Sequence, residues 1–488
     1  MSNKLPDLDT DFSNWYTQVI NKAGLADYGP VKGTMVIRPY GYEMWDRIKN
    51  VFDKMIKSTG HVNAYFPLFI PKSFLAKEAE HVEGFAKECA VITHTRLKAD
   101  DNEGVIIDPE SKLEEEIIVR PTSETVIWSM YKKWIQSYRD LPILINQWAN
   151  VVRWEMRTRL FLRTSEFLWQ EGHTAHETEE EAKKETLDIL NLYKILAEKY
   201  LAIPVITGIK TDSEKFAGAE QTYCIEAMMG DKRALQAGTS HNLGQNFARA
   251  FNVTFQTKDN KEDLVWATSW GISTRLVGAV VLTHGDQKGL RLPPMIAPIQ
   301  IVVVPIYKKG KEKKSVENYI NNIEEILKKI NIRVHVDWSD NSPGFKFNDW
   351  EMKGVPIRFE IGSRDLQNKS LVLARRDTRT KENLPISELI KTVPKVLEKI
   401  QKNLYDQALN FRETNTYNVK SFEEFKQIIK KGGFIRCGWD GTDETERRIK
   451  EKTKATIRCI PFDESPTGLN CVFSKKPAKH EVIYAKAY

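Results

Sequence analysis

Three charged residues in strand-like or glycine-containing surroundings stand out as candidates for chemistry. Arg153 and Glu155 close a run that reads Asn-Val-Val-Arg-Trp-Glu, and Arg275 ends a Gly-Ile-Ser-Thr-Arg run that follows an apolar segment with two tryptophans. Guanidinium groups bind phosphate oxygens in a planar, two-pronged geometry. Two such cations and one carboxylate therefore suit a polyphosphate ligand better than a solvated surface. Arg153 and Glu155 alone are more simply explained as an ion pair on a strand.

The chain contains neither of the common glycine-rich phosphate loops. No segment matches G-x-x-x-x-G-K-[ST] or G-x-G-x-x-G, the patterns in which backbone amides hold the phosphates. If the protein binds a nucleotide, side chains must therefore do the work that backbone amides do in those folds.

Length and composition indicate a multidomain globular protein that is slightly basic. The 488 residues suffice for two or three domains, and 41% hydrophobic and 28% charged residues are ordinary for such a protein. The net charge of +7 is compatible with a polyanionic partner such as RNA, but a slightly basic enzyme explains it equally well. We expect a cytoplasmic protein, because the N-terminus is polar and acidic, no apolar run suits a membrane span, and the five cysteines are scattered.

The elements that must position these charges are predicted to form an antiparallel sheet with flanking helices. Apolar residues at helical spacing predict helices over 12–23 and 40–57, and Thr178 and Glu181 form a capping-box signature for a third helix that ends near Tyr200. Short apolar segments separated by proline and charge predict antiparallel strands over 61–69, 91–93, 104–107, 116–120, 223–229 and 264–270. This is an α+β arrangement.

A second and a third unit are predicted after a proline-containing boundary at residues 292–295. Predicted strands and one amphipathic helix alternate in the manner of a compact α/β domain, with strands over 299–306, 332–338, 355–361 and 371–375 and the helix over 315–330. The last part holds the later cysteines and a β-rich end over 482–488. We therefore expect three domains, at residues 1–294, 295–403 and 404–488.

The arginine-containing runs resemble the signature motifs of the class II aminoacyl-tRNA synthetases. Residues 153–155 are similar to the core of motif 2, with Val152 where an aromatic residue usually stands. Residues 271–275 resemble motif 3, and the strand around residues 67–71 resembles motif 1. Further segments, in the same order, match the prolyl-tRNA synthetases of the archaeal and eukaryotic type: Arg120–Glu124, Phe167–His173, Lys215–Ala219, Gln236–His241, Ser342–Phe347 and Ala485–Tyr488. The resemblance covers nearly the whole chain.

The resemblance implies a fold, a reaction and a set of partners. The fold would be α+β, a class II synthetase antiparallel sheet with flanking helices, followed by an α/β anticodon-binding domain and a small α+β C-terminal domain. The reaction would join proline and ATP to prolyl-adenylate and transfer the prolyl group to the 3′ end of tRNA(Pro), with Mg²⁺ accompanying ATP. The implied partners are proline, ATP, tRNA(Pro) and, through motif 1, a second copy of the chain in a homodimer, with no membrane.

The resemblance also assigns roles in nucleotide binding. Arg153 would bridge the proline carboxylate and the α-phosphate, Arg275 would hold the γ-phosphate, and Glu155 would accept a hydrogen bond from the adenine amino group. Arg153 and Arg275 are thus the expected catalytic residues, and the attacking carboxylate, already ionised, needs no general base. Glu226 is a candidate ligand for Mg²⁺. The remaining expected ATP contacts are Arg163, Gln236 and Thr239.

For the amino acid, the resemblance implies a pocket that takes a flat apolar ring bearing a charge. The expected proline contacts are Thr122, Glu124, Arg153, Trp169, Glu171, His173, Phe216 and His241. Taken singly, Trp169 or Phe216 is more simply a core residue. Because one missing methylene is worth only about 1–3 kcal/mol of discrimination, alanine and cysteine should also be activated. The segment between motifs 2 and 3 leaves no room for an inserted editing domain, so we expect no proofreading in cis.

In the second domain the resemblance points to Glu351, Arg358 and Arg364 as anticodon contacts. Arginine forks and carboxylates both pair well with guanine edges. The alternative for these three residues is a set of salt bridges on the surface of an α/β domain.

The C-terminal unit departs from the family. Many relatives hold zinc there with four cysteines in two pairs, whereas Cys437 has no close cysteine partner and Ser474 stands where a C-x-x-C pair with Cys471 would end. Cys459 lies in an apolar run and is predicted to be a core residue. We therefore expect no structural zinc. The last residue, Tyr488, is expected to reach back toward the catalytic domain.

Three local patterns are weighed and set aside. Residues 54–58 resemble the lysine loop of the Rossmann-type synthetases, but they lie inside a helical pattern. Residues 173–177 contain two histidines, yet they satisfy neither H-E-x-x-H nor H-x-x-E-H. The lysine run over 308–314 is most simply a solvated loop.

Two alternative functions stay open. One is another class IIa synthetase, such as a threonyl or histidyl enzyme, and the segments expected to bind proline argue against it. The other is a catalytically silent paralogue that binds RNA, and the presence of Arg153, Glu155 and Arg275 argues against that.

Overall fold

The computed structural model of the chain describes residues 5–76, 88–307 and 311–488. Its helices are α1 (Phe12–Lys22), α2 (Pro39–Lys57), α3 (Lys72–Ala76), α5 (Glu124–Trp134), α6 (Glu179–Ile195), α7 (Asn246–Phe251), α8 (Arg275–His284), α9 (Lys311–Lys329), α10 (Pro343–Met352), α11 (Ser363–Asn368), α12 (Leu389–Thr414), α13 (Phe422–Lys431) and α14 (Asp443–Thr453). Short helical turns are η1 (Pro109–Ser111), η2 (Tyr138–Asp140), η3 (Leu196–Tyr200) and η4 (Ile386–Glu388).

The strands are short in the N-terminal part and longest at the centre of the chain. They are β1 (Ala26–Tyr28), β2 (Met35–Ile37), β3 (Val62–Asn63), β4 (Phe69–Pro71), β5 (Ala90–His94), β6 (Leu97–Asp100), β7 (Gly104–Ile107), β8 (Lys112–Val119), β9 (Ile143–Val152), β10 (Glu166–His176), β11 (Val205–Ile209), β12 (Gln221–Met228), β13 (Ala234–Gly244), β14 (Thr254–Gln256), β15 (Glu262–Leu264), β16 (Trp266–Ser273), β17 (Ile301–Ile306), β18 (Val334–Val336), β19 (Ile357–Gly362), β20 (Ser370–Arg375), β21 (Lys381–Pro385), β22 (Thr416–Asn418), β23 (Phe434–Trp439), β24 (Thr456–Pro461) and β25 (His480–Ala485).

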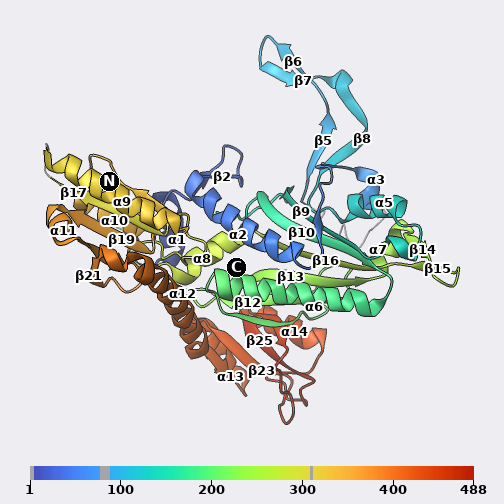
Figure 1. Cartoon of the computed structure of the whole chain (residues 1–488). Coiled ribbons are helices and arrows are strands. Elements are labelled where there is room, and N and C mark those ends of the chain that lie inside the picture. The colour runs from blue at the N-terminus through green and yellow to red at the C-terminus, as the bar shows by residue number, and fades with distance from the viewer. Residues whose placement is uncertain (1–4, 77–87, 308–310) are drawn as a thin grey trace.

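One large sheet runs through the catalytic half and into the C-terminal unit. Its order is β22-β23-β25-β24-β11-β12-β13-β16-β10-β9-β3, and the pairs from β11 to β9 are all antiparallel. The two parts join where β24 pairs with β11, with Gly208 opposite Pro461 and Ile209 opposite Ile460. The strands of the predicted third unit therefore extend the catalytic sheet rather than form a detached one (Figure 1).

Helix α6 covers one face of the sheet, as the capping-box signature predicts. The Thr178 side chain accepts a hydrogen bond from the backbone N–H of Glu181, which satisfies one of the free amides of the first turn. The buried face of α6 presents Ile189, Leu190 and Tyr193 to the strands. Helices α1, α2 and α8 contribute to the same apolar core. The predicted helices over 12–23 and 40–57 are confirmed, and residues 54–57 belong to α2.

The region of motif 1 differs from its prediction. Instead of one strand over 61–69, β3 pairs in parallel with β9, and β4 pairs with β8 in a separate three-stranded sheet. The reason is local: Pro67 has no N–H for a ladder, and the N–H of Phe66 donates to the side chain of Gln147 rather than to a strand. The arm formed by β5 and β8, with the β6–β7 hairpin at its tip, extends away from the body (Figure 1).

The second unit is an α/β domain, as predicted. In its five-stranded sheet β17 is parallel to β18 and β19, whereas β20 and β21 are added antiparallel. The lysine run at 308–314 is not simply a loop, because α9 begins at Lys311; residues 308–310 lie outside the described part. Helix α12 leads from this domain to the C-terminal strands (Figure 1). Within the described ranges no helix is long and apolar enough to cross a bilayer.

Candidate active site

A cavity of about 270 Å³ opens on the large sheet and gathers most of the predicted ligand contacts. Strands β10, β13 and β16, the start of α5 and the start of α8 contribute its walls. The predicted residues that line it are Thr122, Glu124, Arg153, Trp169, Glu171, His173, Phe216, Gln236, Thr239, His241 and Arg275. Glu155 and Arg163 line an adjoining cavity of about 230 Å³, which also contacts Arg153 and Arg275.

Strand geometry explains how residues far apart in the sequence reach one cavity. Trp169, Glu171 and His173 alternate along β10, so their side chains leave the same face of the sheet. On β13 the spacing of Gln236 and Thr239 breaks this alternation. A register shift against β12 resolves the conflict, because Gly238 pairs with Ile225 and Gln236 with Glu226, which leaves one extra residue between them. This bulge turns Gln236 to the same face as Thr239.

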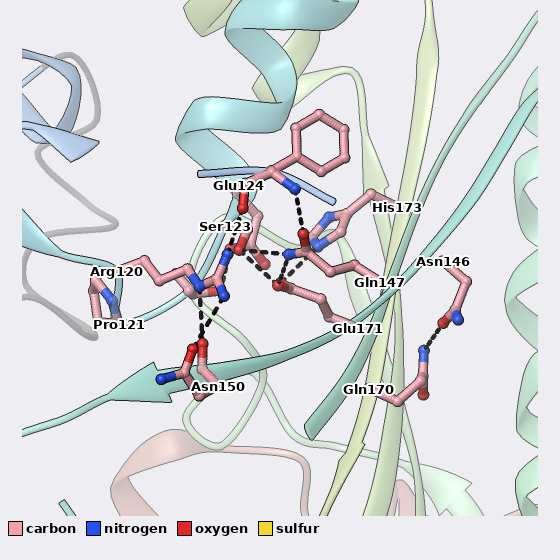
Figure 2. A network of polar contacts seen from close by, with 12 residues as sticks. Arg120, Pro121, Ser123, Glu124, Asn146, Gln147, Asn150, Gln170, Glu171 and His173 are labelled. Atoms are coloured by element: carbon pink, nitrogen blue, oxygen red, sulfur yellow. Dashed lines mark hydrogen bonds and ion pairs between the residues drawn. The ribbon is translucent and has the colours of Figure 1, made fainter. Parts of the chain in front are cut away.

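A buried polar network forms the floor of the cavity (Figure 2). Ser123 Oγ donates to Glu171 Oε1 at 2.6 Å, and Gln147 Nε2 donates to the same oxygen at 2.7 Å. The other carboxylate oxygen, Oε2, lies 3.0 Å from His173 Nε2. These three contacts orient the carboxylate of Glu171.

The network sets the charge states of Glu171 and His173. Burial opposes the charged form of Glu171, yet the contacts with His173, Ser123 and Gln147 outweigh it and lower the pKa of the carboxyl. Burial likewise lowers the pKa of His173, but the hydrogen bond to Glu171 and the charges of Glu124 and Glu171 raise it overall. Each member of the pair therefore favours the charged form of the other, because an opposite charge in a buried site is poorly screened.

Ser123 and Gln147 were missed as functional residues by the sequence reasoning. Ser123 lies within the Arg120–Glu124 segment, so the segment itself was a signal. Gln147 is a single amide in a strand, and nothing in the sequence marks it. Arg120 of the same segment is structural: it is fully buried and donates to the carbonyl oxygens of Phe66 and Asn150 at 2.7 and 2.8 Å.

Arg153 is held in the cavity by a backbone carbonyl group and two aromatic rings. Its Nε donates to the carbonyl oxygen of Pro121 at 2.9 Å, and its guanidinium lies 5.4 Å from the ring centre of Trp169 and 5.6 Å from that of Phe167. Burial lowers the pKa of Arg153, and the carboxylates of Glu124 and Glu171 counteract it. The aromatic faces and the carbonyl thus fix the direction of this cation.

Arg275 lies among other cations. Its Nε donates to the carbonyl oxygen of Leu162 at 3.2 Å, and no described carboxylate lies within ion-pair distance of it. Burial, together with the charges of Arg163 and Arg153, lowers the pKa of Arg275 to about 10. Like charges gathered in a low-dielectric site are unfavourable without an anion, so this arrangement suits a polyphosphate.

Glu155 faces Arg163 at the mouth of the adjoining cavity. Arg163 Nε lies 3.6 Å from Glu155 Oε2, and the other oxygen accepts from the backbone N–H of Arg157 at 3.0 Å. The predicted adenine contact is therefore already oriented by its own loop.

The C-terminal residue reaches the catalytic half, as expected. Tyr488 donates from its hydroxyl to Asp231 Oδ2 at 2.7 Å, and its ring lies 5.2 Å from the guanidinium of Arg159 and 5.6 Å from that of Arg233. It closes a further cavity of about 280 Å³ that shares Gln236 and Arg275 with the main one.

Glu226, the candidate Mg²⁺ ligand, lines neither the main cavity nor the adjoining one. Its side chain is fully buried where β12 meets the C-terminal strands. Lys210 Nζ donates to it at 2.7 Å, and Arg458 donates to both of its oxygens at 3.1 and 3.0 Å. The expectation of an Mg²⁺ ligand at Glu226 is wrong, because two buried cations already neutralise and enclose the carboxylate.

The predicted anticodon residues are only partly brought together. Glu351 and Arg358 line a depression of about 60 Å³ on the second unit, whereas Arg364 lies on α11 and does not line it. Arg358 Nη2 donates to Glu360 Oε1 at 2.8 Å, and its guanidinium lies 4.2 Å from the ring centre of Phe347. The other lining residues are Val302, Trp350, Val355, Ala374, Arg375, Arg376, Arg379 and Lys381.

The late cysteines are buried thiols. Cys459 belongs to an apolar cluster with Cys224 and Phe434, as expected of a core residue. Cys437 and Cys471 are also buried, and the backbone N–H of Ser474 lies 3.5 Å from Cys471 Sγ. Over the described ranges, no three histidine, cysteine or acidic side chains are grouped as a metal would require.

Models of three protein families match the chain in the order of its units. The model described as tRNA synthetase class II core domain (G, H, P, S and T) matches residues 107–284. The anticodon binding domain model matches residues 300–396, and the model described as prolyl-tRNA synthetase, C-terminal, matches residues 422–488. None of the three is an editing domain.

Full-length relatives carry one name. A protein named proline–tRNA ligase from Porphyromonas gingivalis is 58% identical over 479 residues, which cover 98% of this chain and 97% of the relative. A protein of the same name from Cytophaga hutchinsonii is 56% identical over 491 residues, 100% of each chain. A solved structure described as prolyl-tRNA synthetase from Cryptosporidium parvum, complexed with halofuginone and AMPPNP, is similar with a TM-score of 0.93. It is 38% identical and covers 99% of this chain and 97% of that chain.

These relatives do not support one part of the sequence-based identification. The curated relatives that match at 54–59% identity are bacterial. These bacterial relatives therefore do not support an archaeal or eukaryotic type.

Proposed function

The chain belongs to the prolyl-tRNA synthetases, a class II family. On this premise we propose which residues bind each substrate and which take part in the reaction. As a proline–tRNA ligase it activates proline with ATP to prolyl-adenylate and transfers the prolyl group to the 3′ end of tRNA(Pro). One observation carries the proposed roles: Arg153, Arg275 and the Glu171–His173 pair all line a single cavity.

Proline is proposed to lie over the polar floor of the cavity. Its ammonium group carries two hydrogens, and Thr122 and Glu124 at the start of α5 offer them oxygen acceptors, with Thr122 already donating to Glu124. Trp169 and Phe216 would face the ring, and Phe216 stacks 4.5 Å from the ring centre of His241. Glu171 and His173, locked to each other, would shape the end of the pocket rather than react.

The phosphate chain is proposed to run from Arg153 to Arg275. Arg153 points between the aromatic walls and the triphosphate end, where a guanidinium can bridge the proline carboxylate and the α-phosphate. Arg275 and Arg163 would hold the γ-phosphate, which would relieve the repulsion between these cations. Pyrophosphate then leaves against fixed positive charge, so the protein contributes positioning and charge neutralisation rather than proton transfer. Further proposed ATP contacts are Glu155, Gln236 and Thr239.

Mg²⁺ is proposed to arrive with ATP and to rest chiefly on phosphate oxygens. The three acidic side chains that line the cavity already have partners: Glu171 contacts His173, Glu124 accepts from Thr122, and Glu214 accepts from Lys450. When bound, the ion would add charge neutralisation at the phosphates.

The remaining proposals concern organisation and partners. We propose domains at residues 1–294, 295–403 and 404–488, with anticodon contacts at Glu351, Arg358 and Arg364. A homodimer and a cytoplasmic location are proposed as well. The exposed side chains of Val62, Tyr65 and Phe69, at 60%, 70% and 51%, support a second copy of the chain at motif 1. We propose that the chain follows the archaeal and eukaryotic type of prolyl-tRNA synthetase only in the order and number of its domains.

ATP–pyrophosphate exchange with each amino acid in turn tests the assignment of the cavity. We expect exchange with proline, weaker exchange with alanine and cysteine, and none with threonine or histidine. Discrimination against alanine should stay within about 1–3 kcal/mol per missing methylene. Exchange with another amino acid but not with proline would contradict the proposed pocket. Rapid hydrolysis of alanyl-tRNA(Pro) by the purified protein would contradict the absence of proofreading in cis.

A further inference from the structure

A carboxylate of the catalytic half holds two arginines of the second unit. Asp286 follows the end of α8, and it accepts from Arg376 at both oxygens, at 2.7 and 2.9 Å. Arg379 Nη2 also donates to Asp286, at 3.0 Å. Both arginines lie in the segment that joins β20 to β21.

The same two arginines line the depression proposed to receive the anticodon. Arg376 Nε donates to the backbone carbonyl oxygen of Glu351 at 3.0 Å. Arg379 Nε lies 3.9 Å from the carboxylate of Glu351, which is longer than its 3.0 Å contact with Asp286. Arg379 is therefore placed between two carboxylates and is hydrogen-bonded to only one of them.

The two carboxylates differ in what they can offer an arginine. Burial opposes the charge of Asp286, but the hydrogen bonds and charge of Arg376 outweigh it and lower the pKa of Asp286 to about 2. Asp286 is thus a fixed anion at neutral pH. The side chain of Arg379 is 52% exposed and has room to change its rotamer, and the second carboxylate within 4 Å of its guanidinium is that of Glu351. An arginine bound there would occupy the acceptor that a guanine amino group needs.

We propose that Asp286 is a positioning residue for anticodon recognition, because it keeps Arg379 at a long 3.9 Å ion-pair distance from Glu351 and so leaves that carboxylate free of a hydrogen bond from Arg379 and open to a guanine edge. The inference rests on the proposed anticodon site and adds to it a residue of the catalytic half. Recognition at the second unit then depends on the docking of the two halves, since Asp286 and Glu351 come from different sides of the junction.

Two substitutions and their combination test the inference on the full-length protein with tRNA(Pro). Asp286→Asn keeps one oxygen acceptor for Arg376 but removes the charge that holds Arg379. We expect kcat/KM for tRNA charging to fall about tenfold, the size of one lost base contact, while ATP–pyrophosphate exchange with proline is unchanged. Arg379→Ala alone should cost less than about threefold, as expected of an exposed ion pair.

The double variant separates positioning from simple interface stability. If Arg379 closes on Glu351 in Asp286→Asn, then Arg379→Ala in that background should restore charging to within about threefold of the unsubstituted protein. A double variant that charges no better than Asp286→Asn would overturn the inference. So would Arg379→Ala alone being as damaging as Asp286→Asn, since Arg379 would then be a contact in its own right.

A third variant distinguishes failure of the inference from failure of the proposed site. Glu351→Gln should reduce charging of tRNA(Pro). It should also reduce the ratio of kcat/KM for tRNA(Pro) to kcat/KM for a tRNA whose anticodon guanine is exchanged. If Glu351→Gln is impaired but Asp286→Asn charges normally, the anticodon site stands and only the role of Asp286 is lost. If Glu351→Gln charges normally, the proposed site and the inference both fall.

Discussion

Two arginine-rich pockets of this protein differ in whether carboxylates neutralise their arginines. In the catalytic cavity Arg275 has no described carboxylate within ion-pair distance, and burial together with Arg163 and Arg153 lowers its pKa to about 10. In the depression on the second unit the three least exposed arginines each have a carboxylate partner. These pairs are Arg358 with Glu360 at 2.8 Å, Arg375 with Asp377 at 2.7 Å and Arg376 with Asp286 at 2.7 Å.

The difference matches the ligands that the two sites are proposed to bind. Cations without counterions are costly in the free protein, and the cost is recovered only when a multiply charged anion arrives. Cations already neutralised attract phosphate weakly, but their fixed N–H groups can still read the edges of neutral bases. The protein thus concentrates phosphate affinity where a phosphate must react and keeps selectivity where a base must be read.

The largest expected effect is on stability, and it should differ between the two pockets. Arg376→Met removes one partner of a buried pair and should destabilise the protein by about 3 kcal/mol. Arg275→Met removes a buried cation without a carboxylate partner and should leave stability unchanged or raise it. Denaturant unfolding of both variants in the absence of ligands measures the contrast. Equal destabilisation would mean that the two pockets do not differ in charge compensation.

The next effect is on activation. Arg275→Gln removes charge at the proposed γ-phosphate position and should lower the rate of ATP–pyrophosphate exchange about 10²–10³-fold, as for the loss of one fixed transition-state donor. Binding of tRNA(Pro), followed by filter retention, should be unaffected. Activation that survives this change would remove Arg275 from the catalytic machinery.

A smaller effect is expected at the second pocket. Arg358→Ala should lower kcat/KM for charging of tRNA(Pro) by about 1–3 kcal/mol in transition-state free energy, the worth of one bidentate base contact. Exchange with proline should stay at the level of the unsubstituted protein, which serves as the internal control. If charging is intact, Arg358 is only a partner for Glu360.

The smallest effect is on the pH dependence of stability. Asp286 has its pKa lowered from 3.8 to about 2, so its contribution is fully present above about pH 4 and is lost as pH falls through about 2. We expect this group to contribute about 1–2 kcal/mol at neutral pH. Melting temperatures of the unsubstituted protein and of Asp286→Asn, measured from neutral pH downward, should therefore converge in acid. A constant difference across that range would show that the charge of Asp286 contributes nothing.

Local patterns predicted the parts of the site that depend on strand and helix periodicity. Trp169, Glu171 and His173 were predicted as one set, and they share one face because β10 is extended throughout. Thr178 was predicted to begin a helix, and its side chain does cap α6. The expected strand over 61–69 failed because the proline and the side chain of Gln147 changed the pairing of that segment.

Contacts between distant segments were beyond the reach of the sequence. The bulge on β13 that brings Gln236 beside Thr239 depends on how β12 pairs with it, and no residue pattern announces it. Glu226 was named as a candidate ligand for Mg²⁺. Its enclosure by Lys210 and Arg458 requires knowing that β24 joins the edge of the same sheet.

By itself the sequence determined the family, the reaction and most of the side chains that line one cavity, because motif spacing and periodicity are properties of one continuous chain. Tertiary structure alone decided which charges are neutralised. Among the described residues Arg275 has no carboxylate within ion-pair distance, whereas Arg376 pairs with Asp286, which lies 90 positions away along the chain. The physical reason is that an ion pair needs two groups within about 4 Å, where their Coulomb energy is large, and that distance is set only when separate elements pack.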